Sequence, residues 1–273
     1  MSRTSPRWSR IGRGLLAWAI LLALPVSAPL RMTSAAASET DEAGHAGSTE
    51  AFSAAPVSGT LTLPLDRAGH RLPTVVLVYD ALGPDPRGDR YVAQLLGAGI
   101  AVLEVLSPEE PSAALPLAAA ALAGDPRIDG ARIGVLGFGA GGAAALAAPG
   151  PSAARVLLYP GCAALPRGGP RTAAVDRTAL LLVHGGADPA NPPGACASAA
   201  EALARDGAAV RRIEYARAGF AWDFPSYGLG GRSLLPAPGG MERVPAAPWP
   251  ELAALSAAQV AGFFALALKA AAP

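Results

Sequence analysis

The sequence predicts an α/β fold, in which a mostly parallel central sheet carries helices on both faces. Short continuous apolar runs recur along the chain, as expected for strands that are buried on both sides. Alanine-rich helical stretches separate these runs, and such alternation gives right-handed crossovers between parallel strands. Of the 273 residues, 51% are hydrophobic, which excludes a disordered chain. We therefore expect a single domain after the N-terminal leader.

The N-terminal residues are typical of an export signal. Several arginines precede the apolar run at 15–24 (LLAWAILLAL), which has the length of the apolar part of a signal peptide. We expect cleavage after Ala37, with Ala28 as the alternative site. This predicts a signal peptide at 1–37 and a periplasmic or secreted protein without a transmembrane span. The alternative is an uncleaved membrane anchor, although the apolar stretch at 15–30 is short for a span and contains two prolines.

The charge of the mature chain argues against nucleic-acid binding. Removal of residues 1–37 takes away five arginines and no acidic residue, so the formal charge changes from +1 to −4. A mildly acidic chain lacks the basic surface that attracts a phosphate backbone. The two cysteines and three histidines are scattered and form no recognisable metal-ligand pattern, so we expect neither a metal nor a cofactor.

The segment 38–56 is small, polar and acidic, which predicts a flexible linker before a domain at 57–273. The first predicted strand, at 60–65 (TLTLPL), alternates as a half-exposed strand does. The later strands are mostly continuous apolar runs. In order, the predicted strands are 60–65, 74–79, 100–106, 132–137, 154–159, 179–184 and 210–215.

Helices are predicted between the strands. Ser-Pro-Glu-Glu at 107–110 is a capping box with proline at the first helical position, which starts a helix after the strand at 100–106. The residues at 225–250 are rich in glycine and proline without periodicity, which predicts either a lid or a poorly ordered loop. The other predicted helices are 89–96, 140–148, 195–205 and 252–271.

The two cysteines, Cys162 and Cys196, are predicted to form a disulfide, because an exported chain meets an oxidising compartment. Closing a loop of this length would stabilise the fold by roughly 3–4 kcal/mol. The alternatives are two buried thiols or one reactive thiol.

The turn at 133–142 (IGVLGFGAGG) carries the pattern of a nucleophile elbow. A strand runs into Gly-x-nucleophile-x-Gly and then into an alanine-rich helix. Gly137 and Gly141 are the flanking glycines, and Gly139 holds the nucleophile position. Three further segments accompany this turn, namely DPRID at 125–129, GGADP at 185–189 and AGFAWD at 218–223. Together these residues resemble the dienelactone hydrolase family over about 73–223 and in the closing helix.

The resemblance implies the α/β-hydrolase fold and a catalytic triad at Gly139, Asp188 and Phe220, of which only the acid Asp188 matches. In acyl transfer the histidine accepts the proton of the nucleophile and the acid orients the histidine. Without a nucleophile or a base, the chain is expected to be a pseudoenzyme. Glycine adopts the strained elbow backbone at little cost, so Gly139 is the stabilising choice once catalysis is not required. Asp188 has a second interpretation, as a turn acid before Pro189.

Other groups near the predicted crevice are candidates for ligand binding, because they follow the carboxyl ends of strands or begin the helix after the elbow. Asp80 matches a carboxylate position of the family, and with Asp188 and Asp223 it would allow carboxylate acid–base chemistry. The alternatives are that Asp80 caps a turn and that His184 bonds to nearby backbone. The ligand-binding candidates are Tyr79, Asp80, the backbone N–H of Ala140, His184 and Trp222.

Three functions follow from these observations. The leading one is an exported, dienelactone-hydrolase-like protein that is catalytically impaired or inactive and binds a small ligand or a protein partner at the former active-site crevice. The second is an active hydrolase of small esters or lactones that uses Asp80, His184 and Asp188, or Cys162 as a relocated nucleophile. The third is a structural envelope protein held by an uncleaved N-terminus.

Overall fold

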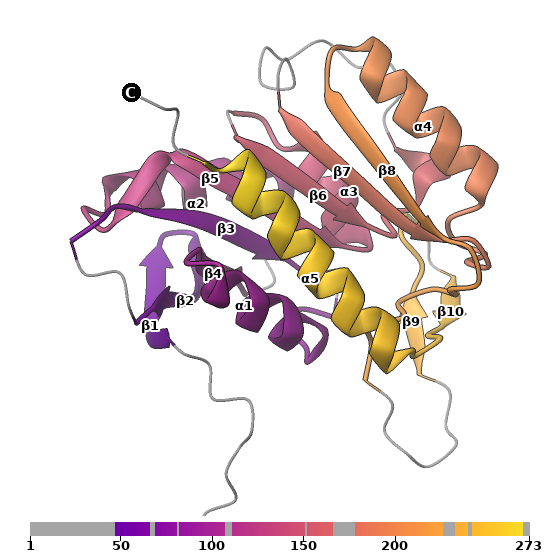
Figure 1. Ribbon diagram of the computed structural model, residues 1–273, viewed down its shortest axis with the longest axis horizontal. Helices are drawn as coiled ribbons and strands as arrows, with labels where there is room; N and C mark the ends of the chain where they lie inside the picture. The colour runs from indigo at the N-terminus through magenta and orange to yellow at the C-terminus, as the bar shows by residue number, and fades with distance from the viewer. Residues whose placement is uncertain are drawn as a thin grey trace, which may run out of the picture. The chain divides into compact units, whose positions relative to one another are not determined.

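The computed structural model (Figure 1) describes residues 47–65, 69–80, 82–106, 111–150, 152–165, 178–225, 233–239 and 242–269. The predicted signal peptide at 1–37 and the capping box at 107–110 lie outside the described residues. Contacts divide the chain into Met1–Asp41 and Glu42–Pro273, and every described element belongs to the second unit.

An eight-stranded sheet in the order β1-β2-β4-β3-β5-β6-β7-β8 forms the centre of this unit. β2 pairs antiparallel with β1 and with β4, whereas all neighbours from β4 to β8 are parallel. The predicted mostly parallel sheet is therefore confirmed. The strands are β1 (Gly47–Ala54), β2 (Val57–Pro64), β3 (Leu72–Val78), β4 (Ala101–Val105), β5 (Ile128–Phe138), β6 (Ala154–Leu158), β7 (Ala179–Gly185) and β8 (Ala209–Tyr215).

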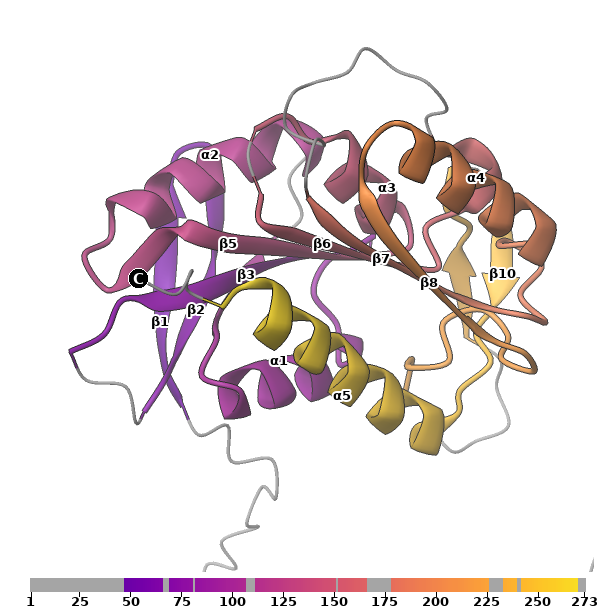
Figure 2. The same cartoon turned by 45° about the horizontal axis from the view of Figure 1, so that its top comes forward.

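Helices cover both faces of the sheet, with α1 and α5 on one face and α2, α3 and α4 on the other (Figure 2). This arrangement explains the continuous apolar runs. In β3, Val75 and Leu77 pack into the core below α1 and α5, whereas Val76 and Val78 pack into the core on the opposite face. The helices are α1 (Arg87–Gly97), α2 (Pro111–Gly124), α3 (Ala140–Ala147), α4 (Pro193–Arg205) and α5 (Pro250–Ala267), with a short 3-10 helix η1 (Cys162–Ala164).

Strand β1 corrects the predicted linker. Residues 47–54 pair with β2 along their whole length, so the prediction of a flexible linker at 38–56 is wrong for this part. Most β1 side chains are small and exposed, and Phe52 packs against the core. A strand held mainly by backbone hydrogen bonds leaves little apolar periodicity in the sequence, which is why the pattern missed it.

Part of the segment 225–250, for which the sequence predicts a lid or a poorly ordered loop, forms a small hairpin. Within this segment, β9 (Leu234–Pro236) pairs antiparallel with β10 (Arg243–Pro245). Leu235 and Val244 are buried and join the hydrophobic core. In both ribbon views the hairpin lies beyond the carboxyl ends of the parallel strands (Figures 1 and 2), which is the edge where ligands bind in such sheets.

Candidate active site

The elbow is built as the sequence predicts. β5 ends at Phe138 and α3 begins at Ala140, so the chain turns at the single residue Gly139, which has φ 55° and ψ −122°. The flanking glycines are required by packing. A Cβ on Gly137 would collide with the backbone of Gly141, and a Cβ on Gly141 would collide with the carbonyl oxygen of Val78. The backbone of a nucleophile elbow is therefore fully formed.

Gly139, which the sequence resemblance assigns to the nucleophile position, has no side chain although the surroundings leave room for a Cβ. A Cβ built on this residue would lie 3.4 Å from Oδ2 of Asp80 and 3.8 Å from Cγ of Pro238, which is ordinary van der Waals contact. The residue is buried. Steric exclusion is thus not the reason for the missing nucleophile, and the elbow keeps its shape without the reactive group.

An aromatic cluster surrounds Phe220, the residue that the sequence resemblance assigns to the position of a triad histidine. The ring of Phe220 lies edge-on to the ring of Tyr159, with centroids 5.2 Å apart, and Trp222 makes a similar contact to Tyr159 at 5.1 Å. Both Phe220 and Trp222 are buried. Such edge-to-face packing is favourable and apolar, so this position has become part of the hydrophobic core.

Asp188 is a structural acid of its turn. One oxygen accepts the backbone N–H of Ala190 at 2.8 Å, and the other accepts Nδ2 of Asn191 at 2.9 Å. Burial raises the pKa of the Asp188 carboxyl to about 6. Its interpretation as a turn acid agrees with these contacts. A hydrogen bond from Ala187 to the carbonyl oxygen of Ala218 joins its loop to the loop that carries Phe220.

Asn191 connects the Asp188 turn to the segment after β6. Its Oδ1 accepts the backbone N–H groups of Gly161 and Cys162, and its Nδ2 also donates to the carbonyl oxygen of Tyr159. The side chain is fully buried. No sequence signal pointed to this role, because a lone asparagine after a proline turn has many uses.

The predicted disulfide is present. Cys162 and Cys196 are bonded, with their Cα atoms 4.9 Å apart, and link η1 to the first turn of α4. Both residues are buried. The alternative of a reactive Cys162 thiol is therefore wrong.

Comparisons with solved structures agree with this geometry. A dienelactone hydrolase-like promiscuous phosphotriesterase from metagenomic libraries has 17% identity and a TM-score of 0.62, over 81% of this chain and 98% of that chain. Esterase 2 of Thermogutta terrifontis has 16% identity and a TM-score of 0.58, over 84% and 97% of the two chains. A hyperthermophilic esterase of Pyrobaculum calidifontis has 17% identity and a TM-score of 0.56, over 81% and 87%.

The chain has the α/β-hydrolase fold. Structures of dienelactone hydrolases and their relatives are among those that share it, which agrees with the resemblance seen in the sequence. No family model matches the sequence, and no curated protein matches it.

In this hydrolase fold, Asp80 lies beside the elbow, where it caps a turn and forms an ion pair. Its Oδ1 accepts the backbone N–H of Leu82 at 3.1 Å, and the carbonyl oxygen of Asp80 accepts the N–H of Gly83, as the turn interpretation expects. Its Oδ2 lies 2.9 Å from Nη2 of Arg87, a fully buried side chain. Arg87 also pairs with Asp85. The sequence did not single out Arg87, because only the fold brings it to Asp80.

A second buried carboxylate, Asp223, lies between two tyrosines. Its oxygens accept the hydroxyl groups of Tyr91 at 2.7 Å and Tyr159 at 2.8 Å. Burial raises the pKa of Asp223, while the nearby Arg87 opposes this shift. Both oxygens are thus used in holding α1 and the β6 end together, so Asp223 joins no catalytic pair with Asp80 or Asp188 through a direct contact.

His184 and Tyr79 have structural partners. Nδ1 of His184 lies 3.2 Å from the carbonyl oxygen of Gly185, and its Nε2 lies 3.0 Å from Nη1 of Arg212. Burial lowers the pKa of His184, so we assign a neutral ring that donates to Gly185 and accepts from Arg212. The hydroxyl of Tyr79 donates to Glu104 at 2.6 Å. Neither side chain is directed to the elbow by these contacts.

The space in front of the elbow is closed by the hairpin. Pro238 follows β9 and lies against both Gly139 and Gly161. A Cβ on Gly161 would approach Cβ of Pro238 to 2.7 Å, so the two segments meet in close contact. We use the term crevice for the region around Asp80, Gly139 and Gly161, to which the sequence resemblance adds Phe220. These four residues are buried, and Ala140 is half-buried.

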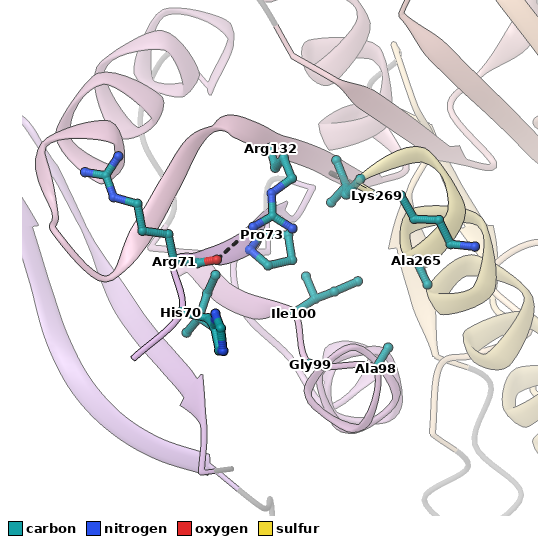
Figure 3. A pocket seen from close by; sticks show the side chains of 11 residues that line it. His70, Arg71, Pro73, Ala98, Gly99, Ile100, Arg132, Ala265 and Lys269 are labelled. Carbon is teal, nitrogen blue, oxygen red and sulfur yellow. Dashed lines mark hydrogen bonds between the residues drawn. The ribbon is translucent and has the colours of Figure 1, made fainter. Parts of the chain in front are cut away.

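A cavity of about 420 Å³ lies at the opposite edge of the sheet, near the start of β3 and β5 and the end of α5 (Figure 3). Its wall includes Arg71, Arg132 and Lys269, which would suit an anion. However, Arg132 is engaged by Asp129 and by the carbonyl oxygen of Arg71. Figure 3 shows the charged ends of Arg71 and Lys269 directed away from the space. This cavity is therefore separate from the elbow and presents few free charges.

Proposed function

We propose that this chain is a hydrolase-fold protein that does not cleave esters through its elbow and that binds a small ligand at the crevice. The observation that carries the proposal is the pair of substitutions at Gly139 and Phe220, on an elbow backbone that is otherwise complete. Acyl transfer by this fold needs a nucleophile and a base to activate it. Gly139 supplies no nucleophile, and the Phe220 ring supplies no base.

The competing proposal of an active hydrolase with relocated groups has little support. It would need Asp80, His184 or Asp188 to be free for proton transfer. Each of these has fixed partners, which are Arg87, Arg212 and Asn191 respectively. Cys162 cannot act as a relocated nucleophile because its sulfur is in the disulfide.

The polar groups at the elbow favour a neutral ligand. The N–H groups of Ala140 and Gly141 have no acceptor within the helix, as at every helix start, whereas Gly142 donates to the carbonyl oxygen of Gly139. Oδ2 of Asp80 lies beside Arg87 but accepts no hydrogen bond of good geometry in the described part of the chain, and it faces the empty nucleophile position. A hydroxyl or carboxamide group would accept from the N–H and donate to Asp80. A carboxylate ligand would instead meet the negative charge of Asp80.

Two assays with the full chain test the proposal. The first measures hydrolysis of short activated esters and simple lactones. Wild type and Asp188→Asn are expected to give no turnover above buffer. The Gly139→Ser/Phe220→His double variant is expected to hydrolyse the esters at a rate about tenfold or more above that in buffer, because it restores both missing groups. The single variants are the controls. Wild-type turnover that collapses in Asp188→Asn would overturn the proposal.

The second assay compares butanamide, 1-butanol and butyrate by thermal shift. These probes have apolar bodies of similar size and differ in the polar group. We expect the amide or the alcohol to raise the melting temperature of wild type and butyrate to leave it unchanged, since ligands that bind the native state stabilise it. An equal or larger shift with butyrate, or no shift with any probe, would contradict a neutral-ligand crevice.

We also propose that the protein is exported, with its signal peptide at 1–37. The disulfide supports this proposal, because such bonds persist in oxidising compartments. The mass of the mature protein from the native host tests it. A mass that matches cleavage after Ala37 or Ala28 is expected, and a full-length, membrane-bound chain would favour the anchor instead.

A further inference from the structure

Pro238 occupies the place from which a ligand would approach the elbow. Its Cγ is 3.8 Å from the position of a Cβ on Gly139. Its Cβ and carbonyl oxygen lie 2.7 Å and 2.9 Å from the position of a Cβ on Gly161, which has φ 76°. Gly161 has no side chain, and this allows the contact. The crevice is therefore filled by a segment of its own chain.

In the described residues 233–239 and 242–246, two short strands, a few hydrogen bonds and a small set of apolar side chains hold this segment. β9 and β10 have three residues each, and isolated two-stranded hairpins have little stability of their own. Within the hairpin, the N–H of Ala237 donates to the carbonyl oxygen of Glu242. The largest apolar anchors are Leu235 and Val244, which are 2% and 9% exposed and reach the core cluster that contains Phe220. The smaller side chains of Ala237 and Ala246 pack in the same cluster. Local opening requires that these apolar side chains leave the core, but it breaks no pairing of the eight-stranded sheet, because β9 and β10 form a separate sheet.

We propose that the β9–β10 hairpin is a closed lid, in which Pro238 blocks the crevice and opening of the hairpin exposes Gly139. Ligand binding at the elbow then has to overcome the free energy of opening. The apparent affinity is the affinity of the open form multiplied by the fraction of molecules that are open. The hairpin competes in this way with any ligand for the same space. The role of the lid in controlling ligand access rests on the proposed ligand site. The closed position of the hairpin does not depend on any ligand.

A single introduced thiol tests the lid. The two native cysteines are bonded to each other, so a Gly139→Cys variant carries one free thiol, which lies at the elbow. The room for a Cβ at this position makes the substitution feasible. The rate at which iodoacetamide alkylates this elbow thiol reports how often the lid opens. A Leu255→Cys variant supplies a reference thiol on the surface, because Leu255 is half-exposed on α5.

We expect the elbow thiol to react far more slowly than the reference thiol, by about 100-fold or more. Adding Leu235→Ala or Pro238→Gly is expected to accelerate alkylation of the elbow thiol by about tenfold or more, because each removes a contact that holds the lid closed. Leu203→Ala is the matched control. Leu203 is buried in the core on the other face of the sheet, so its loss weakens the fold and does not touch the lid.

Two results would overturn the lid. One is alkylation of the elbow thiol as fast as that of the reference thiol with the hairpin unaltered, which would mean that the crevice is open. The other is equal acceleration by Leu203→Ala and Leu235→Ala, which would mean that the thiol reacts through global unfolding. Intact mass after denaturation checks that the native disulfide has not exchanged. Because the assay uses neither ligand nor turnover, its failure is distinguishable from failure of the ligand proposal.

Discussion

At Gly139 the conformational freedom of one residue allows the tight turn between β5 and α3. The backbone there lies at φ 55° and ψ −122°, a region that side-chain-bearing residues enter only with strain. A hydrolase accepts that strain because the nucleophile must project from the turn. Gly139 has no side chain to project, and glycine forms the turn between β5 and α3 without the cost of backbone strain.

This conformation predicts the effect of an alanine at the elbow. Gly139→Ala is expected to lower the free energy of unfolding by about 1–2 kcal/mol, because the strain exceeds the entropy that alanine removes from the unfolded chain. Chemical denaturation of the two proteins measures it. Gly262→Ala is the control, since Gly262 lies exposed within α5 with nothing near its Cβ position. That variant is expected to be more stable by up to about 1 kcal/mol. An equal change in the free energy of unfolding for the two alanine variants would contradict the proposed backbone strain at Gly139.

Residues whose role depends on distant partners could not be predicted from the sequence. The elbow, Asp188 and Phe220 were found because their neighbours along the chain form motifs. Arg87, Asn191 and Tyr159 carry no such signal. Each acts on groups from other elements, as when Arg87 of α1 pairs with the aspartate after β3. Such contacts depend on the fold, so they become visible only in three dimensions.

Among the elements, those buried on both faces were predicted well and those held by backbone bonds were missed. The strands β3, β6 and β7 are mostly apolar because alternate side chains enter two different cores, although each contains one buried polar or charged residue. β1 is mostly exposed, and β9 and β10 are three residues long, so none of them produces a run that a periodicity test would detect. For the segment that contains β9 and β10 the sequence predicts a lid or a poorly ordered loop, and the structure shows that this segment places Pro238 against Gly139.

At the scale of the whole molecule, two buried carboxylates make stability depend on pH. Burial raises the pKa of Asp188 to about 6 and raises that of Asp223 as well. A folded state whose carboxyl pKa is raised binds more protons than the unfolded chain, so each group favours folding at low pH and loses that contribution as the pH rises through its folded pKa. Burial lowers the pKa of His184, which has the opposite effect near its usual value of 6.5.

The Asp188→Asn variant isolates one of these groups. With a pKa near 3.8 in the unfolded chain and about 6 in the fold, Asp188 should cost wild type about 2 kcal/mol of stability between about pH 4.5 and 7. Asparagine does not titrate. The free energy of unfolding of the variant minus that of wild type should therefore increase by about this amount as the pH rises over the same interval, independently of the absolute stability of either protein. Urea denaturation of both proteins at the two pH values gives the difference, from which the contributions of Asp223 and His184 cancel. A difference that stays constant with pH would mean that Asp188 is ionised in the fold as easily as in water, and the desolvation of its carboxyl group by burial would then be wrong.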